Sequence, residues 1–286
     1  MAKKNNLKKR ISPSKRESKS VESTERLLKH TSFSLSSATA IKSDNYKSSF
    51  VLLWETLKDT YKYRWRTFFF VLSYGIIWYV LAGTNTSKAT ASIYSIIFGI
   101  IASLAAIWMI RHREAGERVT IRLAYYEGMV QLIPYCAIVF FLTLQLLPAF
   151  IGFYIFQTTI LSGAVVSTFE RSVPGIVWLF LSLLSLYWTT ATLMSMYVVT
   201  IPYKKPIESI SIGRSLVDGR RWFIIRKVII GSATIVLVFA GFAYWFVSQK
   251  WDEALQQLSV IFPIITLPIV HTYLYKLYKS LLEAGR

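Results

Sequence analysis

The chain has 286 residues, of which 53% are hydrophobic and only 17% are charged, with 33 Lys and Arg against 15 Asp and Glu. Soluble domains have about 25% charged residues, so this composition argues against an ordinary soluble enzyme and predicts a multi-pass membrane protein. The single cysteine, Cys136, excludes an intramolecular disulfide and a thiolate zinc site.

Residues 1–47 are rich in Lys, Arg, Ser and Thr and contain few apolar side chains. Such a segment cannot bury enough apolar surface to fold, so it predicts a largely disordered, basic cytoplasmic tail. No apolar stretch follows within the first thirty residues, which argues against a secretory signal. The tail lacks interleaved aromatic residues, and this argues against nucleic acid as its partner.

The next segment, residues 48–65, has the pattern of an amphipathic helix. Phe50, Trp54, Leu57 and Tyr61 recur at helical spacing and so share one face, whereas Lys58 lies off that face. An aromatic stripe of this kind, placed just before an apolar run, predicts a helix that lies flat at the membrane interface.

Six apolar segments follow and predict an all-α, polytopic six-helix bundle. A bilayer core requires about 20 helical residues, and every segment is long enough. The spans are expected at roughly 67–83, 91–110, 129–157, 174–200, 228–248 and 258–275, within a membrane domain of residues 48–280 that precedes a short cytoplasmic tail, 281–286. An alternative interpretation breaks the third segment at Leu147–Pro148 and adds a re-entrant piece that ends near Glu170.

The basic residues predict the orientation. If the N-terminus, the second and fourth connections and the C-terminus lie on one side, that side has 30 Lys and Arg residues and the other has three. The positive-inside rule then places both termini in the cytoplasm, with the chain in the cytoplasmic membrane. Trp65 and Trp222 fall at inner ends of spans and Trp78 and Trp245 at outer ends, as interfacial belts require.

A weak internal repeat is present. With Lys62, Gly128 and Gly219 in register, a cytoplasmic segment precedes an outgoing and a returning span three times. Trp65 and Trp222 then coincide, three residues after the aligned positions. One interpretation is three helix-hairpin repeats about an axis along the membrane normal. The other is the general preference for Trp at the start of a span.

The stretch 209–222, SISIGRSLVDGRRW, resembles part of a bacterial family of six-helix membrane proteins. These proteins are related to the membrane domain that is fused to some glycerophosphodiester phosphodiesterases, in which an amphipathic helix leads into the fifth span. The resemblance covers roughly residues 48–280 and implies a six-span fold with cytoplasmic pre-helices. The catalytic domain of the fused members is not expected, since six spans leave no room for a barrel of about 250 residues.

Few residues in the spans could perform chemistry. His271 is the one ionisable candidate and has two interpretations, a proton or headgroup ligand or an interfacial histidine near Lys276. Gln145 lies mid-span, either as a link between helices or as a substrate contact. We find no catalytic motif, no cofactor motif and no metal-ligand spacing, so the protein is predicted to be non-enzymatic.

The densest basic stretch precedes and opens the fifth span. It contains the candidate headgroup contacts Arg214, Arg220, Arg221, Trp222, Arg226 and Lys227. Basic residues at the inner surface attract anionic lipid, at about 1 kcal/mol each, but they also simply determine topology.

The leading hypothesis is therefore a lipid-linked or membrane-organising role, with anionic headgroups and other membrane proteins as partners. A small permease for a neutral or lipid-like solute is the first alternative, because scarce intramembrane charge argues only against ion coupling. A membrane-protein assembly factor is the second, although it would require a polar groove at bilayer depth.

Overall fold

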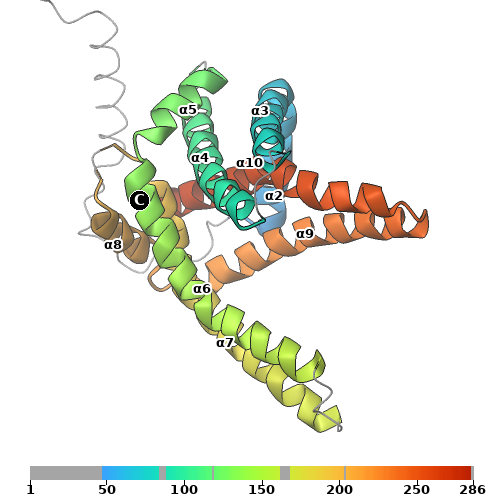
Figure 1. Ribbon diagram of the computed structural model, residues 1–286. Helices are drawn as coiled ribbons and strands as arrows, with labels where there is room; N and C mark the ends of the chain where they lie inside the picture. The colour runs from blue at the N-terminus through green and yellow to red at the C-terminus, as the bar shows by residue number, and fades with distance from the viewer. Residues whose placement is uncertain (1–46, 84–87, 118, 162–167, 203, 285–286) are drawn as a thin grey trace, which may run out of the picture. The chain divides into compact units, whose positions relative to one another are not determined.

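The computed structural model describes residues 47–284 except 84–87, 118, 162–167 and 203, and every regular element in that part is a helix (Figure 1). The all-α prediction is therefore confirmed for these residues. The expectations for residues 1–46 and for the last two residues of the C-terminal tail lie outside the described part of the chain.

Four long helices are long and apolar enough to cross a membrane, and they coincide with four of the predicted spans. The qualifying segments are Ile93–Glu114 of α4 (Lys88–Glu114), Leu132–Leu161, which is all of α6, Ser172–Val199 of α7 (Thr168–Val199) and Arg221–Ser248, which is all of α9. The structure is thus compatible with a multi-pass membrane protein. The first and sixth predicted segments lie within helices α3 (Arg64–Gly83) and α10 (Asp252–Ala284).

Helix α6 runs unbroken through Pro148, so the alternative with a break at Leu147–Pro148 is wrong. A proline inside a helix clashes with the preceding turn and disturbs its hydrogen bonds. Here the backbone N–H of Ala149 donates to the hydroxyl of Ser185 on α7, at 3.1 Å, and Ser185 is fully buried. Helix α7 therefore supplies a hydrogen-bond acceptor for the residue that follows the proline, and α6 continues.

Three short helices precede the three pairs of long helices: α2 (Ser49–Lys62), α5 (Ile121–Met129) and α8 (Pro206–Val217). Each begins at a residue that favours the start of a helix. The hydroxyls of Ser48 and Thr120 accept hydrogen bonds from backbone N–H groups in the first turns of α2 and α5, and α8 begins at a proline, which suits a first helical position.

Helices α5 and α8 each pack on the pair of long helices that precedes them in the sequence, and α2, which comes first, packs on the last pair. Helix α5 contacts α3 and α4, helix α8 contacts α6 and α7, and helix α2 contacts α9 and α10 at the other end of the sequence (Figure 1). Two glycines allow the close approach. A Cβ on Gly128 would lie 3.3 Å from the backbone of Leu104, and a Cβ on Gly213 would lie 2.6 Å from the carbonyl oxygen of Ala191.

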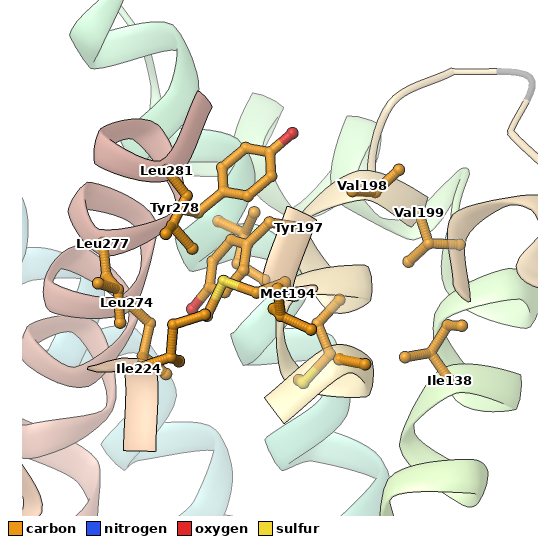
Figure 2. Packing of buried hydrophobic residues seen from close by; sticks show 14 of the residues in the cluster. Ile138, Met194, Tyr197, Val198, Val199, Ile224, Leu274, Leu277, Tyr278 and Leu281 are labelled. Carbon is orange, nitrogen blue, oxygen red and sulfur yellow. The ribbon is translucent and has the colours of Figure 1, made fainter. Parts of the chain in front are cut away.

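The buried core lies at one end of every long helix. We call these the basic ends, since they adjoin the basic segments: the first halves of α3, α6 and α9 and the second halves of α4, α7 and α10. Figure 2 shows Met194 and Tyr197 of α7 packed against Leu277 and Tyr278 of α10, and all four side chains are nearly or completely buried.

The opposite ends of the long helices, which we call the far ends, are mostly exposed. Phe150 and Tyr154 of α6 are 60% and 69% exposed, and Leu237 and Tyr244 of α9 are 71% and 78% exposed. Large apolar side chains without protein partners are the expected surface of a helix that faces lipid.

Candidate functional site

The candidate headgroup contacts lie at the end of α8 and the start of α9. Arg214 is exposed in the last turn of α8, and Arg220 precedes the first residue of α9 and is half-buried. The guanidinium of Arg221 lies 4.5 Å from the centre of the Tyr187 ring on α7, so a cation–π contact orients it. Trp222 is 67% exposed and Arg226 is also exposed.

One face of α9 combines these polar groups with apolar side chains. Trp222, Arg226, Ile229 and Ile230 are separated by steps of three or four residues, so they share a stripe that begins at the basic end. An open groove of about 590 Å³ lies between this stripe and α7. Its lining includes Leu183, Trp222, Phe223, Arg226, Ile229 and Ile230. Arg226 is the only charged residue among the lining side chains.

A second groove lies farther along the same helix, toward its far end. It measures about 500 Å³ and is lined by Leu237, Val238, Gly241, Phe242 and Trp245. No lining residue is charged. The two grooves therefore differ in the presence of one cation and in their position along α9.

Lys227 differs from the other predicted contacts because its side chain is only 1% exposed. Its ammonium group donates to the backbone carbonyl of Lys47, just before α2, and lies 4.4 Å from the centre of the Phe223 ring. The expectation of a headgroup contact is thus not met by this geometry. Lys227 instead links the start of α2 to α9. It lies four residues after Phe223, so the two side chains share one face of α9.

A second lysine holds the middle of α2. The ammonium group of Lys276 on α10 donates to the carbonyl of Glu55 at 2.8 Å and forms an ion pair with Asp59. Leu52 and Thr56 are buried on this side of α2. The aromatic stripe predicted from the sequence, represented by Phe50 at 78% and Trp54 at 70% exposure, faces away from the protein.

The three basic side chains in the last turn of α4 contact other groups of the protein. Arg111 donates to the carbonyls of Tyr197 and Thr200 at 2.8 and 2.7 Å, and also to the Thr200 hydroxyl. It therefore caps the carboxyl end of α7, where a cation is favoured. His112 contacts Glu117 at 2.6 Å. Arg113 is buried, 4.6 Å from the centre of the Tyr63 ring.

The two intramembrane polar candidates both link helices. The side-chain oxygen of Gln145 on α6 accepts from the hydroxyl of Thr192 on α7 at 2.8 Å, which agrees with the helix-linking interpretation. His271 on α10 is 7% exposed, and its Nδ1 lies 3.2 Å from the hydroxyl of Tyr197 on α7. It is thus part of the core, where it links α7 to α10.

Three polar contacts join the three returning helices at their basic ends. Arg111 links α4 to α7, the Tyr197–His271 pair links α7 to α10, and Lys279 links α10 to Glu114 of α4 at 2.9 Å. The hydrogen bond to Glu114 raises the pKa of Lys279. Similarly, the hydrogen bond from Lys204 lowers the pKa of the exposed Glu208 on α8.

The residues missed from the sequence are acceptors and partners rather than cations. Tyr197, Thr200 and the carbonyls of Lys47 and Glu55 have no motif, because their role depends on which helices meet. Among the described residues, no three His, Cys, Asp or Glu side chains are grouped to hold a metal ion.

Comparisons with protein-family models, with curated proteins and with solved structures found no match to this chain. The resemblance to the six-helix family therefore depends on residues 209–222 and on the expected layout of six spans with cytoplasmic pre-helices.

Proposed function

We propose that the chain is a non-enzymatic, six-span protein of the cytoplasmic membrane that binds anionic lipid headgroups at its cytoplasmic face. The observation behind this proposal is the exposed set of Arg214, Trp222 and Arg226 beside an apolar groove at the start of a membrane-length helix. An aromatic residue at headgroup depth together with cations is the arrangement that attracts an anionic membrane surface.

The six-span, N-in and C-in topology completes the proposal. Its support is the distribution of 30 Lys and Arg residues on one side and three on the other. Helices α3 and α10 would then be the first and last spans. Reporter fusions after Asn85, Thr168 and Lys250 should report outside, and fusions after Gly116 and Lys205 should report inside. A fusion after Thr168 that reports inside would contradict the six-span topology.

We also propose that the domain consists of three related helix hairpins. Supporting evidence is the register of α3, α6 and α9. Counted from each first residue, the second position is exposed and the fourth and seventh are buried in all three helices. These positions are Trp65, Ile133 and Trp222; Thr67, Tyr135 and Ile224; and Phe70, Ile138 and Lys227. The first and third copies keep the register expected from the sequence, and the middle copy is shifted by two residues.

The two grooves on α9 suit lipid, since they are lined by apolar side chains apart from Arg226. Apolar walls would also suit the lipid-like solute of the permease alternative, and the exposed cations beside the first groove favour binding of an anionic headgroup. The membrane-organising role would then follow from bound anionic lipid at the cytoplasmic face.

The headgroup proposal is tested by replacing three arginines that lie outside the groove lining. The variant Arg214→Gln, Arg220→Gln, Arg221→Gln should co-purify with less anionic lipid than the parent, measured by lipid extraction and mass spectrometry. Its topology should be unchanged, because the remaining basic residues still mark the inside. The preference of the parent should weaken with salt, since exposed charges are screened beyond about 8 Å at physiological ionic strength. Equal anionic lipid in parent and variant would leave topology as the only role of these three cations.

A further inference from the structure

The groove between α7 and α9 has a chemistry that matches one amphipathic ligand. Leu183, Ile229 and Ile230 supply apolar walls, and Arg226 supplies one cation. Its volume of about 590 Å³ lies within the usual range for a small-molecule site, about 300–1,000 Å³. We propose that this groove holds one anionic phospholipid, with its phosphate at Arg226 and an acyl chain against the apolar walls. This inference rests on the proposed function and narrows it to one site.

The order of residues along α9 gives the ligand a direction. From Trp222 to Ile230 the helix rises about 12 Å, at about 1.5 Å for each residue. The indole ring lies at the basic end, the guanidinium one turn farther on, and the isoleucines beyond it. A phospholipid with its headgroup at the basic end presents phosphate and then hydrocarbon in the same order. The long side chain of Arg226 can also extend back toward the headgroup layer.

The guanidinium suits a phosphate better than a neutral headgroup. Arginine donates several hydrogen bonds in a planar fork, and charge-assisted bonds of this kind are roughly twice as strong as neutral ones. Arg226 is exposed and is one of the residues that line the groove, so its guanidinium is accessible to a headgroup at the groove's edge. A soluble anion would satisfy the guanidinium but would leave the apolar walls uncovered, which favours a lipid.

The corresponding positions in the other two hairpins lack the cation. Arg226 is the sixth residue of α9, and the sixth residues of α3 and α6 are Phe69 and Ala137. Position alone therefore does not require an arginine at this depth. We expect one anionic phospholipid site for each chain, at the third hairpin, rather than three equivalent sites.

The experiment uses the full-length protein in detergent micelles doped with phosphatidylglycerol or phosphatidylcholine. Native mass spectrometry counts the lipid molecules that stay bound during stepwise delipidation. The parent should retain one phosphatidylglycerol molecule. Arg226→Gln should reduce its retention at least about tenfold, because a charge-assisted contact is lost. Ile229→Trp, which fills the groove, should reduce retention to a similar extent.

Two matched variants control for charge and for bulk. Arg122→Gln removes an exposed cation on α5, outside the groove, and Val238→Trp fills the second groove on the same helix as Arg226; both should keep the tightly held lipid. Thermal melting of all four variants checks that they fold. Free glycerol phosphate, which has the headgroup chemistry without a chain, should not displace the lipid at equal concentration.

The outcomes separate this site from the general function. If Arg122→Gln and Arg226→Gln lower retention equally and Ile229→Trp has no effect, the groove is not a site, although the cytoplasmic face still binds anionic lipid. Displacement by glycerol phosphate would likewise overturn a site that depends on the acyl chain. A parent that retains both lipids equally would contradict the groove and the proposed function together.

Discussion

Both ends of α7 contain large apolar side chains, but the surroundings of these side chains are opposite. At the far end, Ile176 and Phe180 are 63% and 66% exposed, whereas Met194 and Tyr197 at the basic end are completely buried. In lipid an exposed apolar side chain has little to gain from a protein partner, so the far ends need no packed core. The basic ends contain most of the charges and most of the buried polar side chains, and these groups require specific partners.

This difference suggests that specificity of folding resides mainly in the basic ends. Polar contacts at Arg111, His271 and Lys279 each join two returning helices there. The buried contacts among them are sensitive to small displacements, because an unpaired buried polar group costs about 1–3 kcal/mol. Substitutions should therefore have large effects at basic ends and small effects at far ends.

The strongest test replaces one glycine at each end by alanine. At Gly213 the added Cβ would overlap the hydroxyl oxygen of Ser195 and lie 2.6 Å from the carbonyl of Ala191, so α8 must shift away from α7. We expect Gly213→Ala to destabilise the protein by about 3 kcal/mol, at the upper end of typical overpacking. Gly241→Ala meets no atom within 4 Å and should be neutral or stabilising by up to about 1 kcal/mol. Thermal melts in one detergent compare them, and equal losses would contradict the comparison.

The next test removes the cap on α7. Arg111→Gln loses the charge that binds two carbonyls and a hydroxyl at the carboxyl end of the helix. We expect a loss of about 2 kcal/mol, in the range for hydrogen bonds to charged groups. Lys250→Gln removes an exposed cation at a far-end turn and should change stability by less than about 0.5 kcal/mol. Chemical denaturation of both variants checks this ranking, which a larger effect at Lys250 would reverse.

A smaller effect is expected where α2 meets α10. Lys276→Met removes the ion pair with Asp59 and the bond to the Glu55 carbonyl, at a cost of about 1–2 kcal/mol. Hydrogen exchange should accelerate in α2 and stay constant at the far ends of α6 and α7. Lys58→Met, an exposed substitution on α2 itself, serves as the control. Unchanged exchange in α2 after Lys276→Met would show that Lys276 does not hold the helix.

The smallest effect concerns the pair of Lys279 and Glu114. The pKa of Lys279 is raised above its usual 10.5, mainly by the hydrogen bond to Glu114, so the pair contributes stability below pH 10.5. That contribution disappears as the pH rises through the folded-state pKa of Lys279. Both groups are partly exposed, so we expect less than about 1 kcal/mol. The stability difference between parent and Lys279→Met should shrink between pH 9 and alkaline pH above 10.5, and a growing difference would contradict the assignment.

The sequence predicted helices well and contacts between them poorly. Hydrophobic length and helical spacing are local properties, so the spans of α4, α6, α7 and α9 and the exposed stripe at Phe50 followed from the pattern. The burial of Lys227 did not, because it depends on the meeting of α9 with α2. A sequence comparison of the first and third hairpins offers one signal, since the apolar Phe70 occupies the position that corresponds to Lys227.

The Pro148 region shows the same limit. A proline in an apolar run is compatible with a broken or an intact helix, and here the hydroxyl of Ser185, 36 residues after Ala149 in the chain, bonds the backbone next to the proline. In the candidate site, the cations were evident from the sequence, whereas the groove depends on Leu183 of a different helix.

The docking of α2 on α9 and α10 has a consequence for synthesis at the ribosome. Lys276 and its acceptor Glu55 are 221 residues apart, so α2 emerges long before its partner exists. At about 5–20 residues per second, that interval is roughly 10–40 s. Until α9 and α10 are made, Leu52 and Thr56 lack the helices on which α2 packs. The first helix of the described chain is thus among the last to be packed, and docking of α10 is the step that completes the packing of α2.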